Sequence, residues 1–350
     1  MASPFTLREF QPTDGPAYAD LLAACPDTGS VGMVETFEID PYQALMGLHR
    51  DTVGVVAEMP GRSGLVGGGL IRFRPCQWDG QVLPSALLNT LVVHPDFRRR
   101  GLAALLAGWR EDYARQRFGD QGIILAIIQS NNTGSERTAQ KWASQFLRHR
   151  LVIVANQMRS RPPAPSREYT VRPIQPDDLE SVVAQQNQFY QDYNLYPPET
   201  ASELGAWLAE TPFATPYRHY LVVCDKAGQI LAGLALVENS RLRKTIVTHL
   251  PPFLRLGNQL LHILPPDGVM RELVVSRVWY APGQIAAARL LFETARWEWR
   301  ERGTFLEFFA DTRSPLLSLC KILPWTGKTI DSFALRGPTP CSEDRLLYYA

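Results

Sequence analysis

The stretch VHPDFRRRGLA, residues 93–103, decides how the first half of this chain folds. It follows an apolar run, 86–93, that is typical of a strand. It precedes a segment whose apolar residues recur at helical spacing, at Leu102, Leu105, Leu106, Trp109 and Tyr113. The first turn of a helix has unpaired N–H groups and the positive end of the helix dipole, which together bind phosphate. The stretch therefore predicts an anion site between a strand and a helix.

Small and basic residues within the stretch favour this phosphate site. Gly101 and Ala103 leave the backbone open to a phosphate group, and the arginines at 98–100 supply charged, forked donors. No Gly-Lys-Ser/Thr follows, which excludes a P-loop. The G-x-G-x-x-G spacing of a dinucleotide-binding turn is also missing. The alternative is a basic surface turn without a ligand, and the flanking strand and helix argue against it.

Residues 98–103 fit Arg-x-x-Gly-x-Ala after a strand that ends in Val-His-Pro, and in this they resemble the acyl-CoA signature of the GNAT acetyltransferase superfamily. The resemblance implies that acetyl-CoA, or another acyl-CoA, is the cofactor. Its pyrophosphate would bind Arg98, Arg99, Arg100, Gly101, Leu102 and Ala103, largely through backbone N–H groups. Main-chain groups near Leu91 and Val93 would pair with the pantetheine arm, where the fourth and fifth strands of the family's fold splay apart.

The rest of the first half has the element order expected of a GNAT domain. An Asp-Gly pair at 79–80 predicts a hairpin turn. The sequence predicts strands at 5–10, 52–58, 65–73, 122–128 and 150–157, and helices at 14–24 and 135–146. Asn131 and Asn132 stand before the second helix, where they are expected either to reach CoA by hydrogen bonds or to cap the helix.

A repeat divides the chain into two halves. TLREFQPTD at 6–14 recurs as TVRPIQPDD at 170–178, and GLVGGGLI at 64–71 is echoed by QILAGLAL at 229–236. The two matches have nearly the same offset, which favours a duplicated domain over two similar strand–turn–helix starts.

The duplication predicts an α/β protein of two tandem GNAT-like domains. Each is expected to be a mixed, mostly antiparallel sheet with splayed central strands, flanked by helices. The expected boundaries are 1–160 for the first domain, 161–168 for a Pro-rich linker and 169–350 for the second. We expect the domains to pack on each other, whereas the sequence leaves the oligomeric state open.

The second copy of the signature is degenerate. Aligning the leucine pair 105–106 with 290–291 puts Gly283 in the place of Arg98 and Ala286 in the place of Gly101, and the arginines are gone. The sequence around this turn predicts a strand at 271–280 and a helix at 285–302. We expect a domain retained for packing, and the alternative is a second phosphate site at this turn. A basic, Pro-containing insert at about 241–267 is expected to cover a cleft or the domain interface.

Composition agrees with a soluble intracellular protein, and we expect the chain in the cytoplasm. A net charge of +1 over 350 residues argues against broad nucleic-acid binding. No signal peptide and no membrane-spanning apolar run is recognisable, so no membrane partner is expected. The five cysteines include no C-x-x-C pair, and neither a metal site nor a disulfide framework is indicated.

Catalytic residues are harder to assign. GNAT enzymes often carry a Glu on the fourth strand and a Tyr on the last helix, but this chain has no acid at 87–91 and has Trp142 at the Tyr position. Glu35 and Glu38 are our candidates for the base, with His94 as a weaker one. We expect an acetyltransferase that acts on an amine of a small molecule or peptide, with catalysis in the first domain. The alternatives are a catalytically silent acyl-CoA-binding or sensing protein, and a scaffold that binds no CoA.

Overall fold

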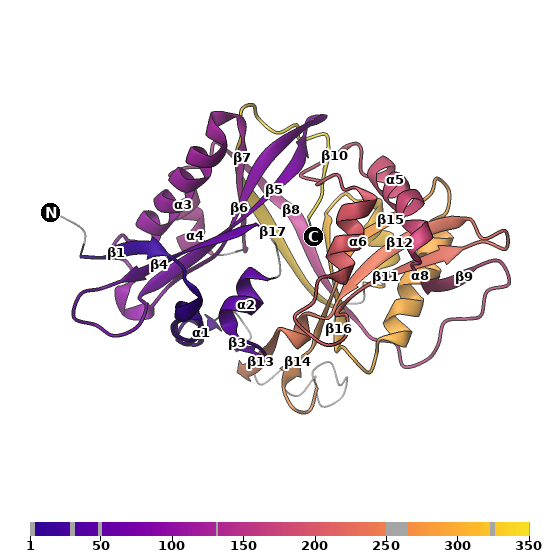
Figure 1. Cartoon of the computed structure of the whole chain (residues 1–350), viewed down its shortest axis with the longest axis horizontal. Coiled ribbons are helices and arrows are strands. Elements are labelled where there is room, and N and C mark those ends of the chain that lie inside the picture. Colours follow the sequence, from indigo (N-terminus) through magenta and orange to yellow (C-terminus); the bar gives the residue numbers. More distant parts are fainter. Residues whose placement is uncertain are drawn as a thin grey trace. The chain divides into compact units, whose positions relative to one another are not determined.

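The computed structural model describes residues 4–28, 32–47, 51–130, 132–249, 265–322 and 326–349. Its contacts divide the chain into two compact units (Figure 1). Unit 1 comprises residues 1–149, 242–262 and 331–343, and unit 2 comprises residues 150–241, 263–330 and 344–350. None of the helices in these described ranges has the length and apolar character needed to cross a membrane.

Unit 1 is built on a mixed sheet. Its strands, in spatial order, are β1 (Thr6–Glu9), β4 (Thr52–Glu58), β5 (Gly67–Trp78), β6 (Gln81–Val93), β7 (Ile123–Ile128) and β17 (Gly327–Arg336). Neighbours are antiparallel except β6 and β7, which are parallel. The predicted Asp79-Gly80 turn joins β5 to β6, and both residues have the positive φ values, 49° and 90°, that a tight hairpin turn requires.

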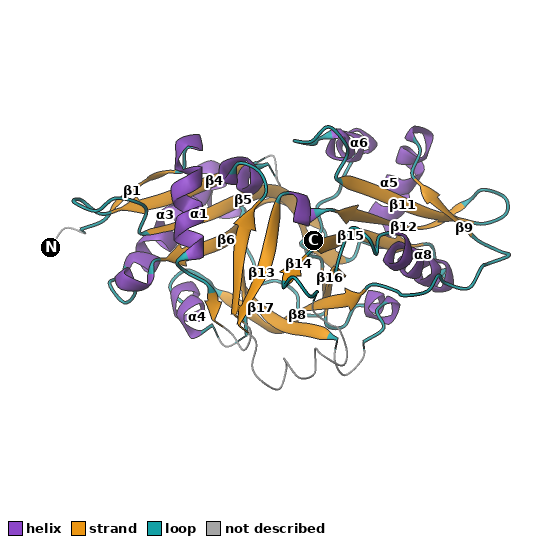
Figure 2. Cartoon of the chain, turned by 90° about the horizontal axis from the view of Figure 1, so that it is seen from below, coloured by secondary structure: helices purple, strands orange, loops and turns teal. Residues whose placement is uncertain are grey.

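Helices cover both faces of this sheet (Figure 2). They are α1 (Gly15–Ala23), α2 (Pro41–Met46), α3 (Leu102–Phe118) and α4 (Thr133–Ala139). Gly67 approaches Leu106 of α3 and the next residue, Gly68, approaches Tyr18 of α1, so the two helices lie on opposite faces. A smaller antiparallel sheet contains β2 (Asp27–Thr28), β3 (Gly32–Phe37) and β13 (Arg243–His249).

The helix expected at 135–146 is shorter than predicted. Helix α4 ends at Ala139, and β8 begins at Gln145. Trp142, between them, is buried in a cluster with Ile124 and Ala334. Burial of this indole outweighs continuation of the helix, and Trp142 is a packing residue.

Unit 2 has a sheet of the same design. Its strands, in spatial order, are β9 (Thr170–Pro173), β11 (Arg218–Cys224), β12 (Ile230–Val237), β15 (Glu272–Tyr280), β16 (Phe305–Asp311) and β8 (Gln145–Gln157). Only β15 and β16 are parallel. The helices are α5 (Leu179–Phe189), α6 (Ala201–Ala209) and α8 (Ile285–Glu298), and the remaining short strands are β10 (Tyr193–Asn194), β14 (Val269–Met270) and β18 (Leu346–Leu347).

The sheet of each unit includes a strand from the other half of the sequence. In unit 1, Ser332–Arg336 of β17 pairs with β7. In unit 2, Leu151–Gln157 of β8 pairs with β16. The predicted strand at 150–157 therefore exists, and it lies in the second unit. Its apolar pattern identifies a strand without specifying the partner, because pairing is a non-local property.

The repeat found in the sequence is a structural repeat as well. In unit 1, Arg8 donates two hydrogen bonds to Asp14, at 2.6 and 2.8 Å, and Asp14 caps the N–H of Gln11. In unit 2, Arg172 makes the same fork to Asp178, at 2.5 and 3.0 Å, and Asp178 caps Gln175 in the same way. Both motifs join the first strand of a sheet to its first helix.

Candidate functional site

The two parallel strands of unit 1 open a wedge. Strands β6 and β7 pair only through Ser85–Leu87 and Ile123–Leu125 among the described residues, although both strands continue further. Beyond this point the main chain of β6 runs toward Val93 without β7 as its ladder partner. The wedge lies where the resemblance to the GNAT family implies a splay between two central strands.

A bulge bends β6 at the mouth of the wedge. Gly68 pairs with Val92 and Leu70 with Asn89, so two residues, Thr90 and Leu91, face Gly69. Thr90 has a φ of 50°, which is uncommon for a residue with a branched side chain. Such bulges bend a strand and redirect its main chain, and they recur beside functional sites.

The turn after β6 leaves a row of N–H groups without partners. Arg99 and Gly101 have φ values of 63° and 83°, and the Gly101 carbonyl accepts hydrogen bonds from Ala104 and Leu105 at 3.1 and 3.2 Å. In the described part of the chain, no hydrogen bond takes up the amide N–H groups of residues 99–103. A Cβ built on Gly101 would meet nothing within 4 Å, so the backbone is open to a ligand. This arrangement matches an anion site at a helix N-terminus.

Positive charge surrounds these amides. Residues 98–100 are exposed arginines, and Arg100 also lies 5.2 Å from the ring centre of the buried Phe97. Arg62 lies on the same ring at 4.6 Å and forms an ion pair with Asp96 at 3.6 Å. The turn therefore combines backbone donors with more cations than its local acid can neutralise, as a doubly charged phosphate group requires.

Several predicted contacts are already engaged within unit 1. The Val93 carbonyl accepts hydrogen bonds from Arg98 Nε at 3.2 Å and from the Cys25 thiol at 3.4 Å. Burial raises the pKa of the Cys25 thiol, which keeps it a neutral donor. Asn132 caps α4, because its side chain accepts the N–H of Ser135 at 3.0 Å. Asn131 lies outside the described residues.

His94 has a structural role at the turn. Its Nδ1 accepts the N–H of Asp96 at 3.3 Å and so caps the 3₁₀ helix Pro95–Phe97. The ring is also 3.4 Å from a guanidinium nitrogen of Arg62. These contacts orient the turn.

Both carboxylates suggested as bases are ion-paired. Glu35, on β3, lies 3.0 Å from Arg243, and Glu38, just after that strand, lies 2.6 Å from Lys244. The cations come from β13, which pairs with β3 and lies within the insert expected at 241–267. Residues 250–264 of that insert are outside the described residues. Both candidate bases are therefore held by cations of β13.

Two buried polar side chains at the bulge were not anticipated from the sequence. The Tyr18 hydroxyl donates to the Thr90 carbonyl at 3.3 Å, and burial raises the pKa of this phenol. Arg110 donates to the Asn89 carbonyl at 3.0 Å. A signal was present, because Arg110 follows Leu106 by one helical turn and therefore lies on the apolar face of its helix.

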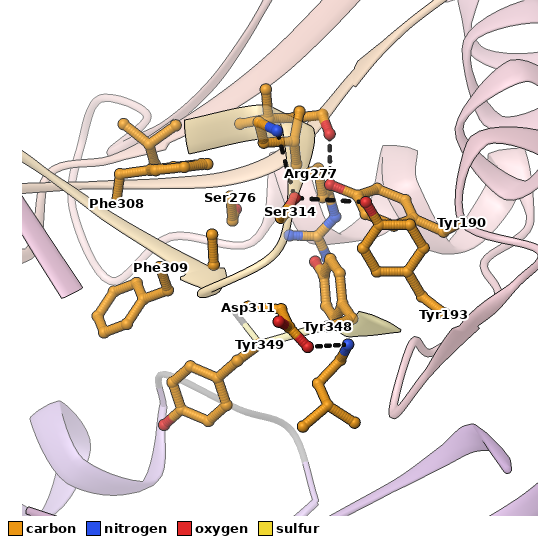
Figure 3. Close-up of a pocket in the computed structure, with 15 residues that line it drawn as sticks. Tyr190, Tyr193, Ser276, Arg277, Phe308, Phe309, Asp311, Ser314, Tyr348 and Tyr349 are labelled. Carbon is orange, nitrogen blue, oxygen red and sulfur yellow. Dashed lines mark hydrogen bonds between the residues drawn. The ribbon is translucent and has the colours of Figure 1, made fainter. Parts of the chain in front are cut away.

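Unit 2 has the same wedge, but its own C-terminal segment packs against it. Strands β15 and β16 pair through Val275 and Phe308 and then diverge. The Leu347 N–H donates to Asp311 at 3.0 Å, and residues 347–349 line a cavity of about 20 Å³ together with the diverging strand ends (Figure 3). This volume is that of about one water molecule.

The turn before α8 also differs from its counterpart in unit 1. Helix α8 begins at Ile285, directly after Pro282 and Gly283. A groove of about 660 Å³ at this helix N-terminus is lined by Glu168, Asp225 and Lys226, together with Gln284. Two acids and one lysine stand here, in contrast to the arginines of unit 1.

Comparisons with known proteins agree with this geometry. Residues 18–143 match the family model described as Acetyltransferase (GNAT) family, so unit 1 carries a GNAT acetyltransferase domain. No curated protein sequence matches the chain.

Solved structures resemble the whole chain. A GCN5-related N-acetyltransferase from Sphaerobacter thermophilus aligns with a TM-score of 0.60 and 16% identity over 98% of each chain. N-myristoyltransferase from Saccharomyces cerevisiae, with bound myristoyl-CoA, aligns with a TM-score of 0.62 and 11% identity over 100% of this chain and 86% of that one. A tandem GNAT protein from the clavulanic acid biosynthesis pathway aligns with a TM-score of 0.58 and 13% identity over 96% of this chain and 100% of that one. The predicted tandem GNAT fold is confirmed.

Proposed function

We propose that this chain, with its GNAT domain in unit 1, is an acyltransferase that uses acetyl-CoA or another acyl-CoA and acylates an amine of a small molecule or peptide. The observation that carries the proposal is the turn 98–103, beside the wedge between β6 and β7. It has three exposed arginines and five amides that no hydrogen bond from the described residues takes up. In this proposal the first sequence repeat, residues 1–160, carries the CoA site, and the second, residues 169–350, has a supporting role. The protein acts in the cytoplasm.

The turn and the wedge divide the binding of acyl-CoA between them. The amides of Arg99, Arg100, Gly101, Leu102 and Ala103 hold the pyrophosphate, and the main chain of β6 at Leu91 and Val93 orients the pantetheine arm. Bound acyl-CoA supplies an activated thioester carbonyl. The protein holds the amine in line with that carbonyl, which by itself lowers the barrier by several kcal/mol.

Proton removal from the amine falls to Glu35 or Glu38, directly or through water. These are the carboxylates that the fold brings to β3, next to α1 and its Tyr18. Their ion pairs with Arg243 and Lys244 hold each carboxylate in a fixed position.

Unit 2 takes no acyl-CoA in this proposal. Its α8 turn lacks the arginines and is lined by Glu168 and Asp225, which repel phosphates. Its wedge is packed against residues 347–349. One acyl-CoA therefore binds per chain.

A second candidate function is acyl-CoA binding or sensing without catalysis. The observation that favours it is that both candidate bases are ion-paired while β6 carries no acid. Two measurements separate the candidates. Calorimetric titration of the full chain with acetyl-CoA tests the shared binding step, and release of free CoA thiol in the presence of an amine panel tests transfer.

We expect one binding event per chain and thiol release with at least one class of amine. Binding without release from any amine in a broad panel would favour the sensing protein. No heat of binding with acetyl-CoA or with longer acyl-CoAs would overturn both functions.

A further inference from the structure

Arg110 is a buried cation at the centre of unit 1. It lies in the middle of α3, is only 3% exposed, and pairs with no carboxylate among the described residues. Its hydrogen bonds go to backbone carbonyls, from Nη1 to Leu70 at 3.3 Å and to Asn89 at 3.0 Å, and from Nε to Leu106 at 3.3 Å. Burial lowers the pKa of this guanidinium to about 10, so it stays charged at neutral pH. Burying a charge without an ion-pair partner costs free energy, so the presence of Arg110 at this position calls for an explanation.

The guanidinium clamps the β6 bulge. Leu70 of β5 and Asn89 of β6 are the residue pair next to the bulge. Nη1 of Arg110 therefore bridges β5 and β6 at the edge of the bulge. Gly69, opposite the bulge, leaves the space for this group, because a Cβ there would lie 3.0 to 3.1 Å from three guanidinium atoms. Thr90 holds its positive φ directly beside the clamp.

Unit 2 builds the same bulge with an apolar side chain opposite it. Gly233 pairs with Trp279 and Ala235 with Ser276, which leaves Arg277 and Val278 opposite Leu234. The φ of Arg277 is 52°, close to the 50° of Thr90. Leu234 thus stands in the place of Gly69.

The helix on this face shows what replaces Arg110. The alignment of residues 105–106 of α3 with 290–291 of α8 matches buried positions with buried positions. The matched residues are Leu102 with Ala287, Leu106 with Leu291, Ala107 with Phe292, and Arg110 with Ala295. A buried leucine and a buried alanine therefore take the place of the glycine and the arginine. In unit 2 the bulge therefore forms with an apolar pair at these two positions, while its cation, Arg277, belongs to the bulge itself and pairs with Glu199 at 2.5 Å.

From this contrast we infer that Arg110 is a positioning residue for the acyl-CoA site. This inference rests on the proposed function. Arg110 holds the Asn89 carbonyl and so fixes the peptide that leads into Thr90 and Leu91, at the mouth of the wedge where the pantetheine arm binds. It touches neither acyl-CoA nor the amine. Arg110 affects how the pantetheine and thioester part of the ligand binds. The turn 99–103 binds the pyrophosphate independently of Arg110.

The test exchanges the unit 1 pair for the unit 2 pair in the full chain, as Gly69→Leu with Arg110→Ala, and compares it with Arg110→Lys. Two probes are titrated by calorimetry. Acetyl-CoA contains the whole ligand, and 3′-phosphoadenosine 5′-diphosphate contains the nucleotide and pyrophosphate without the pantetheine arm. The melting temperature of each variant is measured in parallel.

We expect the double variant to melt within a few degrees of the parent, to bind acetyl-CoA about tenfold more weakly or worse, and to bind the nucleotide probe within about twofold of the parent. Arg110→Lys, which keeps a buried donor, should retain more acetyl-CoA affinity than the double variant. Equal affinity of parent and double variant for acetyl-CoA would overturn the inference, and so would a parallel loss of both ligands or failure of the double variant to fold. Absence of acetyl-CoA binding by the parent would instead refute the proposed function.

Discussion

Glu35 of β3 and Arg243 of β13 lie 208 positions apart in the sequence and form an ion pair at 3.0 Å in unit 1. The neighbouring pair, Glu38 with Lys244, repeats the arrangement at 2.6 Å. The segment that follows β3 is therefore locked to a strand from the second half of the chain, and two candidate bases are fixed by two cations.

The first prediction concerns these carboxylates. Replacing both, as Glu35→Gln with Glu38→Gln, should lower the rate of acyl transfer and shift its pH profile, while the affinity for acetyl-CoA stays within about twofold because the phosphate turn is separate. The matched control, Arg243→Gln with Lys244→Gln, breaks the same ion pairs and leaves both carboxylates in place. If the carboxyl variant and the control have the same pH–rate profile as the parent, neither Glu is the base.

The second prediction uses a pair of matched glycines. Gly101 in unit 1 and Gly283 in unit 2 have φ values of 83° and 77°, and a Cβ on either meets nothing within 4 Å. Aspartate at either position bears a similar backbone strain, of about 1 kcal/mol. Only Gly101→Asp places negative charge among the amides at 99–103, and it should weaken acetyl-CoA binding by about a hundredfold or more. Gly283→Asp should bind acetyl-CoA like the parent, and calorimetry showing equal affinity in all three proteins would remove the turn as the binding site.

Local signals in the sequence predicted the features that depend on neighbouring residues. The Asp79-Gly80 turn, the strand at 52–58 and the strand–turn–helix around Gly101 follow from turn chemistry and periodicity, which act over a few residues. The tandem fold followed from a repeat, because two similar segments at one spacing fold in the same way.

Features that depend on long-range pairing were not predicted from the sequence. The strand at 243–249 lay in an insert with no indicated partner, and its pairing with β3 determines what Glu35 contacts. The pairing of β8 with β16 and of β17 with β7 involves the same difficulty, since a strand pattern specifies no partner. Arg110 was missed because a single arginine on a helix is ordinarily exposed, and only the space left by Gly69 explains its burial.

The third prediction concerns the two Arg–Asp motifs of the repeat. Asp14→Ala removes the acceptor for Arg8 and for the Gln11 N–H, and it should cost about 1 kcal/mol of unfolding free energy. Asp178→Ala should cost a similar amount in unit 2, because the contacts to Arg172 and Gln175 are the same. Thermal melts of both variants measure this, and a cost at one site alone would contradict structural equivalence of the two motifs.

The pH dependence of this stability has a definite sign. The hydrogen bonds from Arg8 lower the pKa of Asp14 in the folded protein, below the value of about 3.9 of an unfolded Asp. The carboxylate therefore contributes stability above about pH 4, and this contribution is lost as the pH falls through the folded pKa. The unfolding free energies of the parent and Asp14→Ala, measured by denaturation, should differ most at neutral pH and converge in acid. A constant difference across that pH range would rule out the carboxylate charge as its source.

The last prediction concerns the number of ligands. Unit 1 presents three exposed arginines and unpartnered amides at its turn, whereas the corresponding groove of unit 2 is lined by Glu168 and Asp225, and its wedge is packed against residues 347–349. Calorimetry should give one acetyl-CoA per chain, with an affinity that falls as salt is added because arginine–phosphate contacts carry it. Replacing Arg98, Arg99 and Arg100 together with Gln should flatten that salt dependence, and changing the exposed Arg289 on α8 to Gln should leave it as in the parent. A stoichiometry of two, or a salt dependence that survives in the triple variant, would show that phosphate binds elsewhere than at this turn.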